Sequence, residues 1–120
     1  MQALYDQLQV YLNMDEEISF KEFDDFYKKV VKELGDSHES FDEGMLWKAL
    51  FIVENIMSNA DERAKESKGS EAKKYRKIVQ RLQLWAKNLG GRLGALGYNE
   101  EDVNERFNQM FEEGTPAQKG

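Results

Sequence analysis

Residues 41–60 read FDEGMLWKALFIVENIMSNA and contain the longest apolar run of this sequence. Their apolar side chains recur at helical spacing and cover roughly half of the helical wheel, which predicts an unusually apolar helix. Trp47 and Phe51 fall on the other side of the wheel, among charged residues. Such a helix is either the central element of its bundle or part of an interface between chains. The sequence leaves both alternatives open for Trp47 and Phe51, and the second predicts self-association into a homodimer or larger assembly.

Four further helices are predicted on either side of this one. The same periodicity of apolar residues places them at about residues 2–12, 20–34, 70–96 and 100–112. We find no convincing strand. The sequence therefore predicts an all-α fold, a compact bundle of about five helices with a central, highly apolar third helix. We expect residues 1–113 to form a single helical-bundle domain and residues 114–120 to be a disordered tail.

Several helix boundaries carry a capping signal. Ser19, and likewise Ser40, precedes a glutamate by three residues, which is the spacing of a capping box. Gly35 is placed to end the second helix in a left-handed conformation. A break between the third and fourth helices is expected within residues 63–69, and Asn99 is expected to cap the fifth helix.

The glycines of the fourth helix raise a separate question. Gly90 and Gly91 are adjacent, and Gly94 and Gly97 follow. The apolar period continues through these positions, which favours a helix that remains continuous at a cost of about 1 kcal/mol per glycine. A bend at Gly90 and Gly91 is the alternative, and the sequence does not decide between the two.

Residues 11–22 partly resemble a calcium-binding EF-hand loop. That loop needs a carboxylate at its first position and a glycine at its sixth, where this chain has Tyr11 and Glu16. The start of a helix explains the same residues, because Ser19 can cap it and acidic residues before the cap suit the helix dipole. We therefore predict a helix start and no metal site.

The residues needed for most catalytic sites are missing or isolated. The sequence has no cysteine, which excludes disulfides and thiolate chemistry. His38 is the only histidine, so a di-iron bundle site, which needs two Glu-x-x-His pairs, lacks its ligands. His38 is expected to be solvated in a loop. Pairs of acidic residues are interpreted as solvated helix faces. We predict no catalytic residue, no cofactor and no enzymatic activity.

The net charge of −6 conceals an alternating pattern. Residues 1–62 carry 15 acids and 5 bases, residues 63–98 carry 2 acids and 10 bases, and residues 99–120 carry 6 acids and 2 bases. One interpretation is that the basic segment packs beside acidic segments of the same molecule or of a second copy. The other is a basic surface that binds nucleic acid or another anion.

The fourth helix gathers its bases on the face opposite its apolar stripe. The candidate partner-binding residues, for a protein or another anion, are Lys73, Arg76, Lys77, Arg81, Leu84 and Lys87. A leucine among the bases favours a protein partner, and no aromatic residue is interleaved to stack on bases. We therefore expect a non-catalytic, cytoplasmic protein that acts through protein–protein interaction, away from membranes. The alternative is a nucleic-acid-binding accessory protein that uses about residues 70–92.

Overall fold

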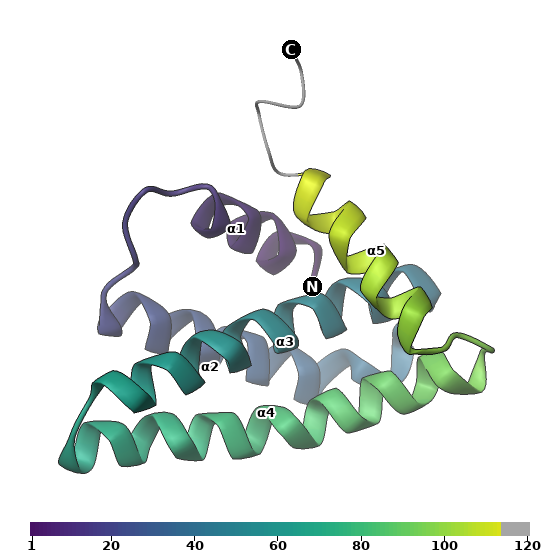
Figure 1. Ribbon diagram of the computed structural model, residues 1–120. Helices are drawn as coiled ribbons and strands as arrows, with labels where there is room; N and C mark the ends of the chain where they lie inside the picture. Colours follow the sequence, from purple (N-terminus) through teal and green to yellow (C-terminus); the bar gives the residue numbers. More distant parts are fainter. Residues whose placement is uncertain (114–120) are drawn as a thin grey trace.

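The structure is a computed structural model that describes residues 1–113 (Figure 1). Within this range the chain forms five α-helices, one short 3-10 helix and no strand, which confirms the predicted all-α bundle. The tail predicted to be disordered, residues 114–120, lies outside the described residues. The elements are α1 Gln2–Leu12, α2 Phe20–Ser37, η1 His38–Ser40, α3 Glu43–Glu66, α4 Gly69–Ala95 and α5 Glu100–Glu113.

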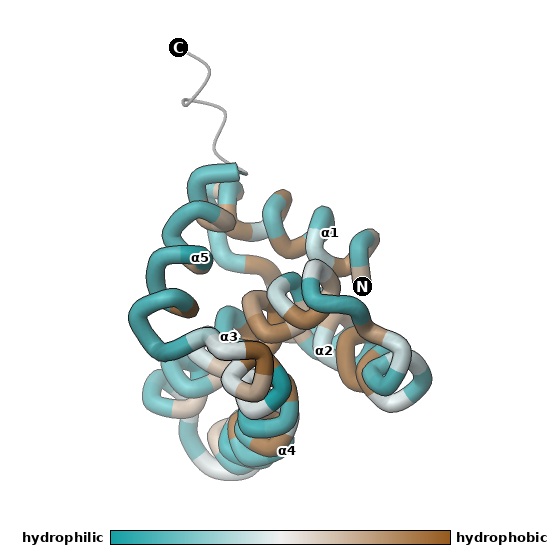
Figure 2. Tube along the Cα trace, turned by 90° about the vertical axis from the view of Figure 1, so that its right-hand side faces the viewer, coloured by the Kyte–Doolittle hydropathy of each residue, from teal (hydrophilic) through white to brown (hydrophobic). Residues whose placement is uncertain are grey.

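The two long helices α3 and α4 form an antiparallel hairpin, and the other helices pack against it. Only Ser67 and Lys68 separate them, so α4 runs back along α3. Figure 1 shows α2 beside this hairpin and α1 and α5 on the side of α3 that faces away from α4. The view turned by 90° in Figure 2 shows the same stacking, with hydrophobic segments gathered between the helices. This arrangement places α3 at the centre of the bundle.

The central position of α3 explains its composition. Four consecutive residues of α3 are buried, and successive side chains of a helix point about 100° apart, so burial extends around most of the helix. These residues are Leu50, Phe51, Ile52 and Val53, none of them more than 4% exposed. The prediction of a central, highly apolar third helix is confirmed.

Trp47 and Phe51 lie inside this core, covered by α5 and by Tyr98 in the connection that precedes it. Trp47 is 3% exposed and Phe51 is 0% exposed. The ring centroid of Phe107 lies 5.4 Å from that of Phe51, and the ring centroid of Tyr98 lies 5.0 Å from that of Trp47. Of the two alternatives, packing inside the fold is the one that the structure shows. The self-association role assigned to Trp47 and Phe51 is corrected accordingly, because the second apolar side of α3 packs on α5.

The starts of two helices agree only in part with the predicted caps. The Ser19 hydroxyl accepts a hydrogen bond from the Glu22 amide at 3.1 Å, which confirms the start of α2. Ser40 does not cap α3, since its hydroxyl donates to the Ser37 carbonyl at 2.9 Å. The cap is the Asp42 carboxylate, whose Oδ1 accepts from the Met45 amide at 2.8 Å. Asp42 is the cap because η1 occupies residues 38–40 and α3 begins only at Glu43.

The start of α5 follows the predicted cap. Asn99 Oδ1 accepts a hydrogen bond from the Asp102 amide at 2.8 Å, and Asp102 Oδ2 accepts one from the Asn99 amide at 2.9 Å. This reciprocal pair satisfies two amides that the first turn of a helix leaves without partners. Asn99 therefore caps α5 as predicted.

The ends of the helices differ more from prediction. Gly35 does not end α2, which continues to Ser37 without a left-handed residue. In α4, Gly90 and Gly91 stay helical, so the continuous helix is the alternative that the structure shows. A left-handed glycine does follow α4, at Gly97 with φ 103°. Of these glycines, only Gly97 follows the end of a helix in a left-handed conformation.

Candidate interaction surfaces

The six candidate binding residues of α4 lie together on a solvent-exposed surface, called here the basic face. All of them are exposed, whereas Ile78 and Leu82 on the other side of the helix are buried. Leu84 is 70% exposed, the largest value for a large hydrophobic side chain among the described residues. The basic face consists of Lys73, Arg76, Lys77, Arg81, Leu84 and Lys87.

The bases of this face have no carboxylate partner within residues 1–113. Ion pairs of lysine in this range join residues four positions apart on other helices, such as Lys28 with Asp24 at 2.8 Å and Lys65 with Asp61 at 3.1 Å. The acidic helices of the same chain therefore do not neutralise the basic face through direct ion pairs. Its charge is directed to the solvent.

A shallow hollow of about 460 Å³ lies beside the basic face, and Tyr27 of α2 lines it together with Lys77, Arg81 and Leu84. Tyr27 is partly buried. Burial raises the pKa of its hydroxyl, and the positive charge of Arg81 acts in the opposite direction. The sequence did not reveal this aromatic neighbour, because Tyr27 belongs to a different helix.

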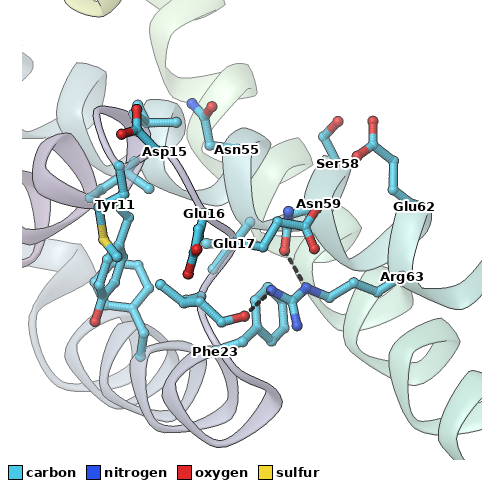
Figure 3. Close-up of a pocket in the computed structure, with 16 residues that line it drawn as sticks. Tyr11, Asp15, Glu16, Glu17, Phe23, Asn55, Ser58, Asn59, Glu62 and Arg63 are labelled. Carbon is cyan, nitrogen blue, oxygen red and sulfur yellow. Dashed lines mark hydrogen bonds between the residues drawn. The ribbon is translucent and has the colours of Figure 1, made fainter. Parts of the chain in front are cut away.

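A second depression, called here the acidic cavity, opens between α1, the connection from α1 to α2, and α3. Its volume is about 360 Å³. Apolar side chains line its interior, namely those of Leu8, Phe23, Phe26 and Ile56. Its carboxylates are those of Asp15, Glu16, Glu17 and Glu62. Figure 3 shows that three of these acids come from the connection and that Glu62 comes from α3.

Arg63 holds the wall of the acidic cavity in place (Figure 3). Its Nη2 donates a hydrogen bond to the Ile18 carbonyl at 2.7 Å, and its Nε donates to Asn59 Oδ1 at 2.7 Å. The guanidinium carbon also lies 4.9 Å from the ring centroid of Phe23. The charge of Arg63 is therefore directed to carbonyl oxygens and a ring, and it forms no ion pair with the four carboxylates.

Two exposed apolar side chains extend the acidic cavity at its edge. Leu12 is 41% exposed and Met14 is 45% exposed, and both line the cavity. The cavity therefore combines an apolar interior, an apolar edge and a rim of carboxylates. These are the surface properties expected of a protein-binding groove.

The acidic cavity was not predicted from the sequence, although one signal was present. Polar residues recur at helical spacing on the otherwise apolar third helix, at Asn55, Ser58, Asn59 and Glu62. All four line the cavity. The missing information was which segment lies opposite this polar stripe, since the connection between α1 and α2 has no periodic pattern.

His38 is packed against the fold and is not solvated as predicted. Its Nδ1 lies 2.7 Å from the Leu34 carbonyl, and its ring makes an edge contact with Trp85 at 5.0 Å between centroids. Its own carbonyl accepts a hydrogen bond from Arg92 at 2.7 Å. These contacts give His38 a structural role at the join between α2 and α4.

Residues 1–113 contain neither a cluster of metal ligands nor a membrane-spanning helix. No group of three or more histidine, cysteine, aspartate or glutamate side chains there is placed to hold a metal ion. No helix in that range combines the length and apolar character needed to cross a bilayer. Comparison of the chain with protein-family models, with curated proteins and with solved structures gives no match.

Proposed function

We propose that this chain is a non-catalytic helical protein that binds another protein through the basic face of α4. The observation that carries the proposal is the exposure of Leu84 among five bases that have no ion-pair partner within residues 1–113. A matching partner presents carboxylates around an apolar contact point. An acidic amphipathic helix has this chemistry.

Leu84 and the bases contribute in different ways to such a complex. Burying a leucine that is exposed in the free protein contributes about 1.5–3 kcal/mol. Exposed charges add less affinity, but they speed the encounter and select an acidic partner. The apolar residue therefore determines most of the affinity, and Lys77 and Arg81 beside it determine which partner is selected.

Nucleic acid is the second candidate ligand, and Tyr27 is the observation that favours it. Its ring lines the hollow beside Lys77 and Arg81, where an aromatic side chain could stack on a base. Tyr27 is partly buried, however, and Leu84 at the same hollow has no counterpart on a phosphate backbone. The structure therefore supports a protein partner better.

Titration with two probes tests the proposal. One probe is an acidic helical peptide with a single leucine, and the other is a single-stranded DNA oligonucleotide. We expect Leu84→Ala to weaken peptide binding about tenfold or more. Lys77→Gln with Arg81→Gln should weaken it further at low salt. The matched control is Lys28→Gln with Lys32→Gln, which removes two exposed bases from α2 and should leave binding unchanged.

The DNA probe separates the two candidate functions. Tight DNA binding that falls steeply between about 50 and 200 mM salt, and that Leu84→Ala does not change, would favour the nucleic-acid function. Binding of the peptide that depends on Leu84, with weak DNA binding at every salt concentration, supports the proposed function.

A further inference from the structure

We infer that the partner of the basic face is a second copy of this chain, which receives it in the acidic cavity. In this contact Leu84 of one copy enters the apolar interior of the cavity, and Arg81 and Lys87 on either side of it meet the carboxylates of the rim. The inference rests on the proposed function and names the partner of the same surface.

The basic face and the acidic cavity have complementary chemistry. The basic face presents one exposed leucine within a set of bases, and the acidic cavity presents an apolar interior within a set of carboxylates. Neither set of charges is paired within residues 1–113, because the ion pairs there involve other carboxylates. Every copy therefore carries one unpaired surface of each kind.

The charges of both surfaces lie on two sides of an apolar centre. Lys77, Arg81 and Leu84 follow one another at intervals of four and three residues, so they form a stripe along one side of α4. Bases occur both before and after Leu84 in this direction, since Lys87 lies three residues beyond it. The carboxylates of the cavity also lie on two sides, with Glu17 on the connection and Glu62 on α3.

The basic face of one copy cannot fill the acidic cavity of the same copy. The residues that line the acidic cavity and those of the basic face do not overlap. Figures 1 and 2 both place α1, which forms one wall of the cavity, on the side of α3 that faces away from α4. The contact must therefore join two molecules head to tail, and such contacts propagate along a filament or close into a ring.

The net charge of −6 does not prevent this contact at moderate salt. The screening length is about 8 Å at physiological ionic strength, so repulsion between whole molecules is weakened. Charges brought into direct contact are closer than this length and still attract. We therefore expect association to be weakened by high salt and to retain a salt-independent part that comes from Leu84.

Complementary variants test the head-to-tail contact by sedimentation velocity. The first variant, Arg81→Ser with Leu84→Ser, loses the basic face but keeps the cavity. The second, Glu17→Lys with Glu62→Lys, loses the acidic rim but keeps the basic face. All four positions are exposed, so folding should be retained, and circular dichroism checks this. We expect the wild type to associate as concentration rises, and each variant alone to remain monomeric.

The decisive sample is the equimolar mixture of the two variants. It contains one intact cavity and one intact basic face, so it should form a complex of one copy of each variant and no larger species. The inference would be overturned if either variant alone associated as the wild type does, or if the mixture of the two variants stayed monomeric.

The proposed function can survive the failure of this inference. If the wild type stays monomeric but still binds the acidic peptide through Leu84, only the choice of a second copy is wrong. If neither the peptide nor a second copy binds, both proposals fail. The second variant should bind the peptide as the wild type does, because its basic face is unchanged.

Discussion

Arg63 shows how one side chain can fix a segment that has no regular structure. It joins α3 to the connection between α1 and α2 through its hydrogen bond to the Ile18 carbonyl, and it lies over the ring of Phe23. Its Nη1 also donates a hydrogen bond to the Tyr75 hydroxyl of α4 at 3.4 Å. One guanidinium group on α3 thus contacts the connection, α2 and α4.

We predict that Arg63→Met destabilises the protein by about 1.5–3 kcal/mol, the usual contribution of hydrogen bonds to a charged group. Methionine keeps an unbranched, apolar side chain at this position but cannot donate hydrogen bonds. Chemical denaturation measures the effect. Lys65→Met is the matched control, because Lys65 is exposed and makes only a surface ion pair with Asp61. Equal effects of the two changes would contradict the role given to Arg63.

Glu54 makes stability depend on pH. Burial raises the pKa of its carboxyl group, so the folded state binds the proton more tightly than the unfolded state does. The stabilisation that comes from this tighter proton binding is therefore fully present below the unfolded pKa of about 4.3. It is lost as pH rises through the folded pKa.

Glu54→Gln should remove this pH dependence, because glutamine stays neutral. We predict that the variant is more stable than the wild type at neutral pH, and that the difference shrinks as pH falls towards the unfolded pKa. Denaturation midpoints measured across this pH range test the prediction. Glu105→Gln changes an exposed residue and serves as control. If the stability difference between Glu54→Gln and the wild type grew on acidification, the prediction would be contradicted.

At the scale of the element, α4 carries glycines that its packing does not require. A Cβ atom built on Gly90, Gly91 or Gly94 would meet no atom of a neighbouring element within 4 Å. The glycines therefore do not serve a close approach of another helix inside the described chain. They leave the last turns of α4 with a lower helix propensity than the rest.

We predict that Gly91→Ala stabilises the protein by about 1 kcal/mol, since alanine has the higher helix propensity and Gly91 is exposed. Thermal denaturation measures the change. Gly97→Ala is the contrasting variant, because Gly97 has φ 103° and alanine would be strained there. Destabilisation by Gly91→Ala would show that α4 bends at this point in solution.

At the scale of the whole molecule, the docking of α5 keeps Trp47 and Phe51 away from solvent. Two rings of α5 pack on Phe51: that of Phe107, nearly perpendicular to it at 86°, and that of Phe111, at 4.9 Å between centroids. If α5 left this position, α3 would lose the contacts of Phe107 and Phe111 with Phe51 and of Arg106 with Trp47, and both rings would become more exposed. Burying such rings between chains would then become favourable.

We predict that Phe107→Asp releases α5 and causes self-association through the exposed rings. In a Trp85→Phe background, the fluorescence of Trp47 should shift to longer wavelength, and light scattering should show more than one chain. Asn108→Asp adds the same charge at an exposed position and should have neither effect. A monomeric Phe107→Asp variant with unshifted fluorescence would contradict the covering role of α5.

The sequence predicted local structure well and long-range contacts poorly. Helix positions follow from apolar spacing within a single segment, and the caps at Ser19 and Asn99 depend on residues three positions away. The environment of Trp47 depends on α5, which lies some fifty residues further along the chain. The hollow at Tyr27 likewise combines residues of α2 and α4. The candidate site was therefore half predicted: its bases were identified, but neither its aromatic neighbour nor the acidic cavity was.

The two-residue connection between α3 and α4 also has a consequence for the folding rate. Contacts within this hairpin join residues that are close in the sequence, whereas the hydrogen bond from Tyr5 to Glu113 joins residues 108 positions apart. Local contacts cost little loop entropy and form first, within about microseconds to milliseconds in helical proteins. We expect α1 and α5 to join a preformed hairpin after the rate-limiting barrier. Substitutions of residues at the contact between α1 and α5 should then accelerate unfolding and leave the rate of folding nearly unchanged.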